Sequence, residues 1–219
     1  MHRYFPEGTN PKTAAKALAT ILFTLRGTPF VYEGEEIGMT NVAFPKIEDY
    51  NDISTHGQYE YAIKEGLSPE EALKAVQFQS RDNARTPMQW TRDTNAGFTE
   101  GTPWLPVHKD FADCCVDSES EDGTSVLSYY RMMNRLRTPS KASDILLQGS
   151  YEELLHEDEH VYAFKRVLGE HAVYTVVNFT NDTVAYNDDI LEGAELLLGN
   201  YENAEKGKLR PAEAAVYMK

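Results

Sequence analysis

The sequence predicts an α/β part followed by an all-β part that folds as an antiparallel β-sandwich. An apolar pattern at helical spacing over residues 10–26 is followed, almost without a loop, by a short apolar run, and this order is typical of an α/β unit. From residue 145 onward the period changes, and alternating runs such as 161–167 and 172–179 lie between clusters of Gly, Asn and Asp. Alternation between turn residues predicts an antiparallel sheet.

The first element is an amphipathic helix over residues 10–26. Pro11 suits a first helical turn and Gly27 suits a stop. The residues that follow, Thr-Pro-Phe-Val-Tyr, are too few for a helix and are bounded by Gly and Pro, so they predict a buried strand. A lone parallel strand leaves a row of backbone groups unpaired. We therefore expect the N-terminal part to be cut from something larger.

Two further helices are predicted after a long loop. Residues 33–52 are acidic and rich in turn residues, so we expect a loop that leaves the end of the strand. Helical stretches follow over 56–65 and 69–80. Ser68 supplies the second helix with an N-cap, and Pro69 suits its first turn.

Residues 81–107 predict an ordered loop, because they are rich in Pro, Gly, Thr and Trp and lack any period. The large apolar area of Trp90 and Trp104 favours packing in the core, with stacking on a sugar as the alternative. The acidic run 117–122 is expected to be a solvated turn.

A last helix is predicted over residues 124–137, with basic residues in its final turns. The change of period after it places a domain boundary near Thr138 and Pro139. The predicted domains are therefore 1–137 and 138–219.

Charge and composition exclude several classes of partner. The formal net charge of −14 argues against nucleic acid and anionic bilayers, which both bind basic surfaces. The sequence has no long apolar run and no signal-peptide pattern, so we expect a cytoplasmic protein. Its two cysteines, Cys114 and Cys115, are adjacent and poorly placed to bridge each other, which fits free thiols in a reducing compartment.

Two long motifs in this order carry a family resemblance. The first is Gly-Thr-Pro-Phe-Val-Tyr-Glu-Gly-Glu-Glu-Ile-Gly-Met-Thr-Asn over residues 27–41. The second is Arg-Asp-Asn-Ala-Arg-Thr-Pro-Met-Gln-Trp over residues 81–90, followed by Ala-Gly-Phe over 96–98. Together with the ending over 209–217, they resemble the oligo-1,6-glucosidase branch of glycoside hydrolase family 13, the α-amylase family.

The resemblance implies that the chain is the C-terminal end of a (β/α)8 barrel followed by the β-sandwich. Residues 29–33 would be the last barrel strand, and an inserted helical subdomain would follow it. Residues 1–137 would then belong to the catalytic barrel with its insertion, and 138–219 would form the sandwich domain. Barrel active sites lie at the C-terminal ends of the strands, where this loop begins.

The resemblance also implies that this chain supplies no catalytic residue. In the family, the nucleophile, the acid/base and the third carboxylate lie on earlier strands, and the sequence begins a few residues after the last of these motifs. Retaining hydrolysis needs a carboxyl pair about 5–5.5 Å apart. Glu33, Glu35 and Glu36 are the alternative source of such a pair, but we expect them to bond backbone amides and neighbouring loops. The chain is then a fragment that is inactive alone.

Candidate substrate contacts come from the same resemblance. Arg81 corresponds to an arginine that binds the non-reducing glucose, and its planar fork suits vicinal hydroxyls. Ser54 stands in Asp-Ile-Ser where many relatives have Asp-Ile-Glu, so it either lines the outer subsite or is plain loop. Arg85 is a further candidate, although scaffold is the favoured role for Arg85 and Asp82. The sequence shows no ligand spacing for a metal, and we expect no cofactor.

The function expected from these observations is hydrolysis of terminal α-glucosidic bonds in short oligosaccharides by the intact enzyme. The expected partners are a small oligosaccharide and the missing N-terminal barrel segment, with self-association through an uncovered strand edge as a further expectation. Two alternatives stay open. One is a non-catalytic carbohydrate-binding or interaction module built on 138–219, and the other is the C-terminal half of a split enzyme.

Overall fold

The computed structural model describes residues 4–219, and their contacts divide the chain into two compact units. The sheet unit runs from the N-terminal segment to Gly38 and resumes over Gly123–Lys219. The inserted unit is Met39–Asp122. The helices before residue 138 are thus shared between both units, while the division at 137/138 stays a prediction about the intact protein.

The helices and strands follow one another in this order: α1 Pro11–Thr24, η1 Glu35–Ile37, η2 Ile47–Asp49, α2 Ile53–Lys64, α3 Pro69–Gln77, η3 Arg81–Ala84, η4 Thr94–Gly97, α4 Val116–Glu121, α5 Val126–Arg137, α6 Ser143–Gln148, β1 Ser150–Leu154, β2 Val161–Leu168, β3 His171–Asn178, β4 Val184–Ala185, η5 Asp188–Leu191, β5 Glu195–Gly199, β6 Lys208–Leu209 and β7 Ala214–Met218. Of the helices in residues 4–219, none is long and apolar enough to cross a bilayer.

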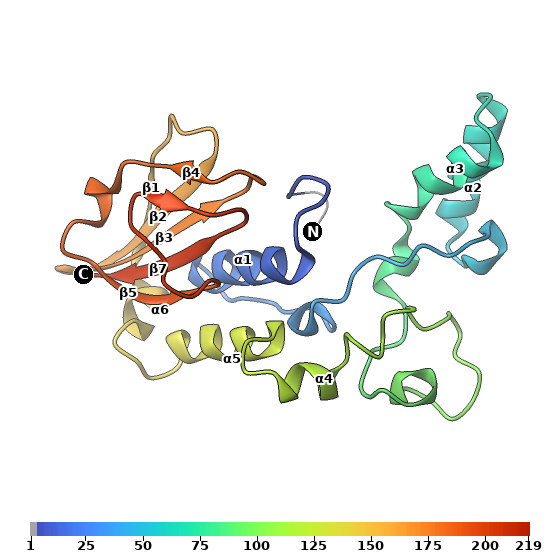
Figure 1. The fold of residues 1–219 in the computed structure, drawn as a ribbon, viewed down its shortest axis with the longest axis horizontal. Helices are drawn as coiled ribbons and strands as arrows, with labels where there is room; N and C mark the ends of the chain where they lie inside the picture. The colour runs from blue at the N-terminus through green and yellow to red at the C-terminus, as the bar shows by residue number, and fades with distance from the viewer. Residues whose placement is uncertain (1–3) are drawn as a thin grey trace. The chain divides into compact units, whose positions relative to one another are not determined.

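An antiparallel sheet in the order β1-β2-β3-β7-β5 forms the centre of the sheet unit (Figure 1). The alternation in the sequence places successive side chains on opposite faces. Val173 of β3 and Val216 of β7 pack with the helices, whereas Val176 and Ala215 pack on the other side with Leu209 of β6. The predicted antiparallel sheet is therefore confirmed, and its two faces have different covers.

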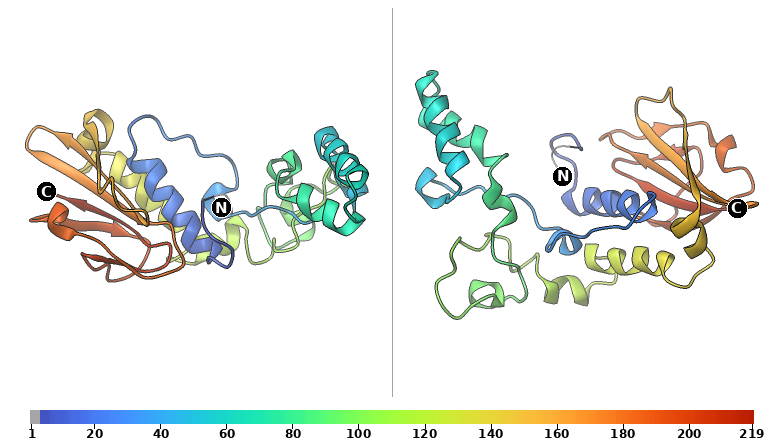
Figure 2. Two further views of the ribbon diagram at one scale, coloured as in Figure 1. Left: turned by 90° about the horizontal axis from the view of Figure 1, so that it is seen from above. Right: turned by 180° about the vertical axis from the view of Figure 1, so that it is seen from behind.

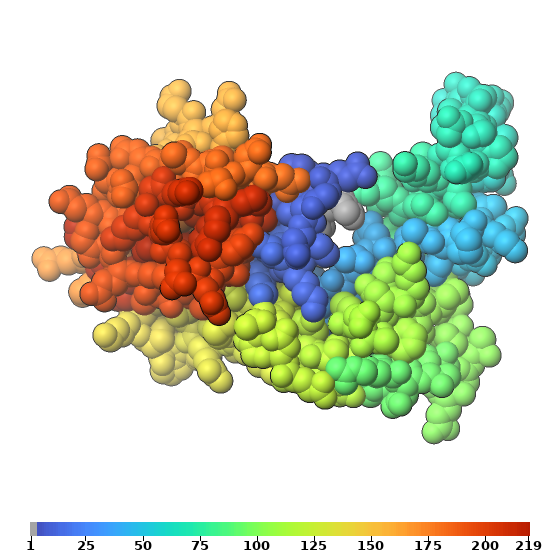
Figure 3. Space-filling view, viewed as in Figure 1, coloured from blue at the N-terminus to red at the C-terminus, as the bar shows by residue number. Residues whose placement is uncertain are grey.

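Helices α1, α5 and α6 cover one face of this sheet (Figure 2). Phe23, Met133 and Leu146, one from each helix, are buried in a single apolar cluster. The other face is covered by the two-stranded β4–β6 sheet and η5. In the space-filling view α1 (blue) packs directly against the strands (orange and red), which agrees with the continuous cluster (Figure 3).

The predicted first helix is confirmed as α1. Its N-cap Asn10 accepts hydrogen bonds from the amides of Lys12 and Thr13, and Pro11 occupies the first turn. The helix ends at Thr24, before Gly27. The Arg137 guanidinium of α5 donates to the carbonyls of Phe23 at 2.7 Å and Gly27 at 2.6 Å, so it satisfies groups that the helix end leaves unpaired.

The prediction of a buried strand over residues 29–33 is wrong for this chain. These residues form no strand, and Phe30 is 84% exposed while Tyr32 is 55% exposed. A strand needs hydrogen-bonded neighbours, and among residues 4–219 none pairs with this segment. The apolar run is present, but the described residues do not bury it.

The inserted unit contains the two predicted helices α2 and α3. Ser68 and Glu71 form a capping box at the start of α3, as the Ser-Pro-Glu-Glu pattern indicates. Residues 81–107 form a loop with two short 3-10 turns, also as predicted. The acidic run at 117–122 was expected to be a turn, but Val116–Glu121 forms helix α4, whose N-cap Cys115 amide bonds the Ser118 hydroxyl.

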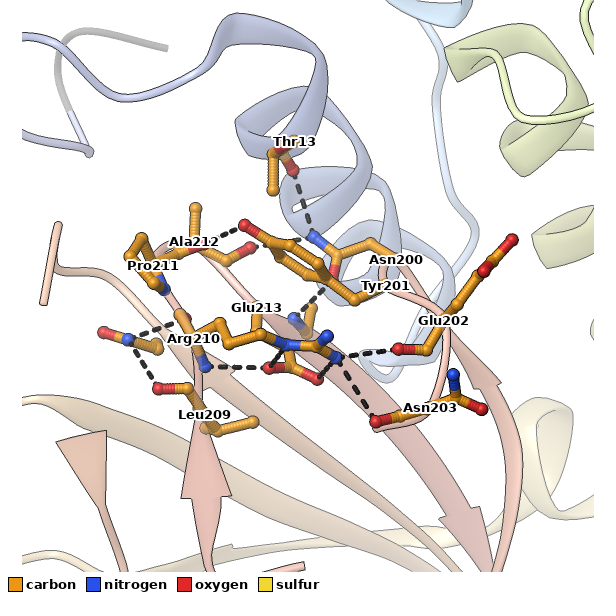
Figure 4. Close-up of polar contacts among 12 residues, drawn as sticks. Thr13, Asn200, Tyr201, Glu202, Asn203, Leu209, Arg210, Pro211, Ala212 and Glu213 are labelled. Atoms are coloured by element: carbon orange, nitrogen blue, oxygen red, sulfur yellow. Dashed lines mark hydrogen bonds and ion pairs between the residues drawn. The ribbon is translucent and has the colours of Figure 1, made fainter. Parts of the chain in front are cut away.

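The ending over residues 209–217 fixes a long loop through one buried carboxylate (Figure 4). Glu213 is 1% exposed and accepts from the Arg210 amide, Nε and Nη2 at 2.7–2.8 Å. The same guanidinium lies 4.3 Å from the Tyr201 ring centroid and donates to the Glu202 carbonyl at 3.0 Å. This part of the motif therefore has a structural role in the sheet unit.

Candidate functional site

The structure brings the three predicted contact residues Ser54, Arg81 and Arg85 together around two buried carboxylates. All five residues lie in the inserted unit, in the segment before and at the start of α2 and in η3. Asp82 is 0% exposed and Asp52 is 6% exposed. Segments separated by about thirty residues in sequence therefore meet at one pair of acids.

Asp52 is the N-cap of α2. Its Oδ1 accepts from the Ser54 amide at 3.4 Å, and its Oδ2 accepts from the Thr55 hydroxyl at 3.0 Å. An aspartate at this position satisfies amides that have no partner inside the helix. Because α2 begins at Ile53, Ser54 lies in the first helical turn rather than in the loop that one interpretation assumed.

Ser54 itself is exposed, and its hydroxyl accepts from Gln58 Nε2 at 3.4 Å. His56 lies one turn into the same helix and bonds the Tyr50 carbonyl through Nε2 at 2.8 Å. His56 therefore helps to hold the chain before α2 against the first turn of this helix. Ser54 keeps a free face toward solvent, so its predicted role in a subsite stays a prediction.

Asp82 lies in the 3-10 turn η3, which Ser80 caps through its hydroxyl at 3.2 Å from the Asp82 amide. Its Oδ2 accepts from the backbone amides of Asn51 at 2.6 Å and Asp52 at 2.9 Å. A buried carboxylate is tolerated when several donors surround it. Asp82 therefore has the scaffold role that the sequence favoured for it.

Arg81 presents its side chain to solvent while its backbone is fixed. Its amide donates to Asp52 Oδ2 at 3.4 Å, and the residue is exposed. Among residues 4–219 its guanidinium takes part in no ion pair. An exposed planar fork on a fixed backbone is the kind of group that can bind sugar hydroxyls or a carboxylate.

Arg85 has the opposite arrangement. Its Nη1 lies 3.3 Å from Asp82 Oδ1 and 3.9 Å from Asp52 Oδ1, and its side chain is 37% exposed. It is the cation that neutralises the two acids, which matches the scaffold role favoured for it. Its predicted contact with a substrate stays a prediction.

The pKa of Asp52 is lowered from its ordinary value. Burial alone raises the pKa of this carboxyl, but hydrogen bonds from the Thr55 hydroxyl and from the Arg81 and Ser54 amides outweigh it, and the Arg81 charge adds to them. Asp52 is therefore ionised at neutral pH. A general acid of a glycosidase needs the opposite shift, so Asp52 is not suited to that task.

The expected structural role of the acids after residue 32 is confirmed for two of them. Glu35 Oε2 accepts from the Tyr32 amide at 3.3 Å, and Glu36 Oε2 accepts from the Gly34 amide at 2.8 Å. These bonds fold the chain back into η1. Among the described residues, no group of three or more His, Cys, Asp and Glu side chains is placed to hold a metal ion.

The prediction that Trp90 and Trp104 pack in the core is wrong. They are 47% and 66% exposed, and Phe98 in the same loop is 50% exposed. The loop is ordered through its backbone instead: the Trp90 amide donates to the Ala96 carbonyl at 2.9 Å, and the Asp117 amide donates to the Trp90 carbonyl at 3.1 Å. Hydrogen bonds rather than indole burial hold this segment.

Sequence reasoning missed the hydroxyls that join the two acids. Thr55 Oγ1 contacts both Asp52 Oδ2 and, at 2.9 Å, Ser80 Oγ. Both residues are buried. The local signals were present, since residues 52–55 read Asp-Ile-Ser-Thr and residues 80–82 read Ser-Arg-Asp, which are both capping patterns. That the two caps meet could not be read from either pattern.

Comparison with known proteins finds one matching family and many relatives. The family described as "Alpha amylase, catalytic domain" matches residues 4–149. The oligo-1,6-glucosidase of Parageobacillus thermoglucosidasius is 42% identical over 98% of this chain and 39% of its own length. The trehalose-6-phosphate hydrolase of Bacillus subtilis (strain 168) is 34% identical over 98% of this chain and 39% of its own length.

Solved structures agree with the sequence relatives. The crystal structure of Bacillus licheniformis trehalose-6-phosphate hydrolase superposes with a TM-score of 0.91 at 34% identity, over 99% of this chain and 40% of that one. The isomaltulose synthase of Klebsiella sp. LX3 gives a TM-score of 0.87 at 34% identity, over all of this chain and 40% of that one. The chain thus spans about 40% of the proteins that it matches.

Proposed function

This chain belongs to the α-amylase family of glycoside hydrolases, and from that membership we propose that it is the glucose-contacting portion of an α-glucosidase. The observation that carries the proposal is Arg81, whose backbone is fixed by a buried acid while its exposed guanidinium forms no ion pair with any residue that the structure describes. The arginine fork would bind hydroxyls of a terminal glucose, and Ser54 would lie toward the next sugar.

We propose that these residues bind sugar and do not cleave it. Glu35 and Glu36 are engaged by backbone amides, and the pKa of Asp52 is lowered rather than raised. Retaining glycosidases need one carboxyl that stays protonated and a second one as nucleophile. Glu35, Glu36 and Asp52 are not arranged as that pair, so catalysis in the intact enzyme would use carboxylates from other barrel strands.

The exposed run at 29–33 is proposed to be the last strand of that barrel. Phe30 is 84% exposed and Val31 is 42% exposed, which is unusual for consecutive large apolar side chains. Neighbouring barrel strands would bury both faces of this run. Without them, the same surface favours self-association of the chain.

The substrate class is proposed as short oligosaccharides with a terminal α-linked glucose, and the protein is proposed to be cytoplasmic. Its relatives carry the names oligo-1,6-glucosidase and trehalose-6-phosphate hydrolase, so the linkage is left open. The two cysteines are unbridged and buried, which suits a reducing compartment.

The experiment combines a binding and a turnover measurement on the purified chain. Ligand-observed NMR with p-nitrophenyl α-glucoside should detect weak binding that the Arg81→Ala variant loses, and release of p-nitrophenol should stay at background. Arg92→Ala, which removes another half-exposed guanidinium of the inserted unit, serves as the matched control. Turnover by the chain alone, or binding that survives Arg81→Ala, would overturn the proposal.

A further inference from the structure

The segments 51–52 and 80–82 are joined by hydrogen bonds in both directions, in which a carboxylate of each segment accepts from backbone amides of the other. Asp82 of η3 accepts the amides of Asn51 and Asp52 at 2.6 and 2.9 Å. In return, Asp52 accepts the amide of Arg81 at 3.4 Å. Each segment thus supplies an acid to the backbone of the other, and we call this arrangement the carboxylate clamp.

Resting on the function proposed above, we infer that Asp52 and Asp82 are positioning residues that set Arg81 and Ser54 relative to each other for sugar binding. Asp52 bonds the amides of both contact residues, Ser54 through Oδ1 and Arg81 through Oδ2. A movement of this one carboxylate therefore displaces both side chains together. Neither acid touches the sugar in this arrangement.

The clamp is built for ionised acids. Every described contact of Asp82 is a donor, namely two amides and the Arg85 guanidinium at 3.3 Å. An asparagine in its place keeps the size but turns an NH₂ group toward at least one of these donors. Hydrogen bonds to charged groups are the strongest in proteins, and leaving buried donors unsatisfied is costly. An asparagine can still accept both amides with its one oxygen, so alanine, which removes both oxygens, is the sharper probe of the clamp.

Thr55 makes the clamp more than two separate caps. Its hydroxyl lies 3.0 Å from Asp52 Oδ2 and 2.9 Å from Ser80 Oγ, the N-cap of η3. The helix start at α2 and the turn at η3 therefore share one hydrogen-bonded chain through Asp52, Thr55 and Ser80. A network of this kind couples its members more strongly than isolated pairs.

Amide hydrogen exchange of the full chain tests the clamp directly. In Asp82→Ala, which removes both acceptor oxygens, the amides of Asn51 and Asp52 should exchange at least about tenfold faster, and in Asp52→Ala the Arg81 amide should do so. In each variant the faster exchange should appear at amides of the segment that does not carry the substitution, and a general loss of stability would not produce this selectivity. Asp93→Ala, at an exposed aspartate of the same unit, is the control that should change neither. Unchanged exchange at the crossed positions would overturn the inference.

A second variant covers the case in which an alanine substitution unfolds the inserted unit. Thr55→Val keeps the shape and both acids but removes the hydroxyl that joins Asp52 to Ser80. Its Arg81 amide should exchange faster while the fluorescence of Trp90 and Trp104 stays native. An unaltered Arg81 amide in this variant would contradict the network.

Sugar binding separates this inference from the proposed function. If Arg81→Ala loses binding of p-nitrophenyl α-glucoside and Asp52→Ala or Asp82→Ala weakens it at least about tenfold with native tryptophan fluorescence, both stand. If Arg81→Ala loses binding but neither acid variant weakens it, the positioning role fails and the function stands. If Arg81→Ala keeps full binding, the proposed function fails. The existence of the clamp is then tested by amide hydrogen exchange alone.

Discussion

The two units of this chain differ in the interactions that stabilise each of them internally. The sheet unit buries apolar side chains on both faces of a five-stranded sheet, with clusters built around Phe23, Met133 and Leu146 on one side and Leu191 and Leu209 on the other. The inserted unit has a small apolar cluster of Val42, Phe44 and Tyr50 with Ile47 and Leu73 packed against it. Much of its described order comes from polar side chains that bond the backbone.

Residues 41–44 illustrate the second kind of order. The Val42 amide donates to Asn83 Oδ1 at 3.1 Å, the Phe44 amide to the Tyr50 hydroxyl at 3.1 Å, and the Phe44 carbonyl accepts from Gln77 at 2.9 Å. Apolar burial has little directional demand, whereas these bonds fix both distance and angle. The difference suits the role proposed for this unit, which is to present the Arg81 side chain at a defined place.

The largest expected effect tests the apolar side of this comparison. Leu146 is 0% exposed in the cluster between α6, α1 and α5, so Leu146→Ala should destabilise the sheet unit by about 3 kcal/mol through lost burial and a cavity. Chemical denaturation followed by far-UV circular dichroism measures the change. Leu147→Ala on the same helix is the control, because Leu147 is 54% exposed. Equal losses in both variants would contradict the assigned core.

The two tryptophans sharpen this test. Trp90 and Trp104 both lie in the inserted unit, and the sequence has two in total, so tryptophan fluorescence reports on that unit alone. Leu146→Ala should leave the fluorescence transition where it was while the dichroism transition moves. A joint shift of both transitions would mean that the two units unfold together. The stability of each unit could then not be assigned to its own interactions.

The second prediction concerns a polar contact in the sheet unit, because this unit is stabilised by apolar burial but also contains a buried ionic contact. Both oxygens of Glu213 face only donors of Arg210, so Glu213→Gln turns an NH₂ group against N–H donors. We expect a loss of about 2 kcal/mol, less than for a fully buried pair because Arg210 is 37% exposed. Urea denaturation followed by circular dichroism gives the value.

The matched control for Glu213 is an ion pair at the surface. Glu121 bonds Arg92 at 2.8 Å, but their side chains are 68% and 49% exposed. Glu121→Gln should leave the denaturation midpoint where it is, since water replaces such pairs readily. If both variants behave alike, burial of Glu213 is not what makes its contact with Arg210 matter.

The same contrast explains how far the sequence could predict the structure. Period and caps sufficed for α1, α3, α5 and the antiparallel sheet, because apolar spacing and Asn10 or Ser68 are local signals. The strand expected at 29–33 failed because pairing depends on neighbours, and a run of apolar residues carries no information about their presence. Trp90 failed for a related reason, since its loop is fixed by backbone bonds.

At the candidate site, the sequence and the family resemblance named Arg81, Ser54 and Arg85, but they could not show what connects them. The link runs through Asp52 and Asp82, thirty residues apart, and neither local pattern reveals the other. Caps are predictable one at a time, because they satisfy amides within a few residues. The contact between the two caps depends on the tertiary structure, so local sequence patterns do not predict it.

The smallest expected effect concerns pH and the inserted unit. Both ring nitrogens of buried His108 face acceptors, Nδ1 the Asp110 carboxylate and Nε2 the Asn41 carbonyl at 3.2 Å, and these contacts suit the protonated ring, whereas the Asp110 amide at 3.3 Å from Nδ1 suits the neutral one. The hydrogen bond to Asp110 accordingly raises the pKa of His108, although burial opposes the shift. Because the folded pKa lies above the ordinary value of 6.5, the contribution to stability is complete below about pH 6.5 and is lost as the pH rises through the folded pKa.

The urea midpoint read by tryptophan fluorescence should therefore fall on the alkaline side in the wild type and fall less in His108→Gln. The variant His171→Gln changes an exposed histidine of the sheet unit and should behave like the wild type. An identical alkaline decline in His108→Gln would show that the protonated ring does not stabilise this loop.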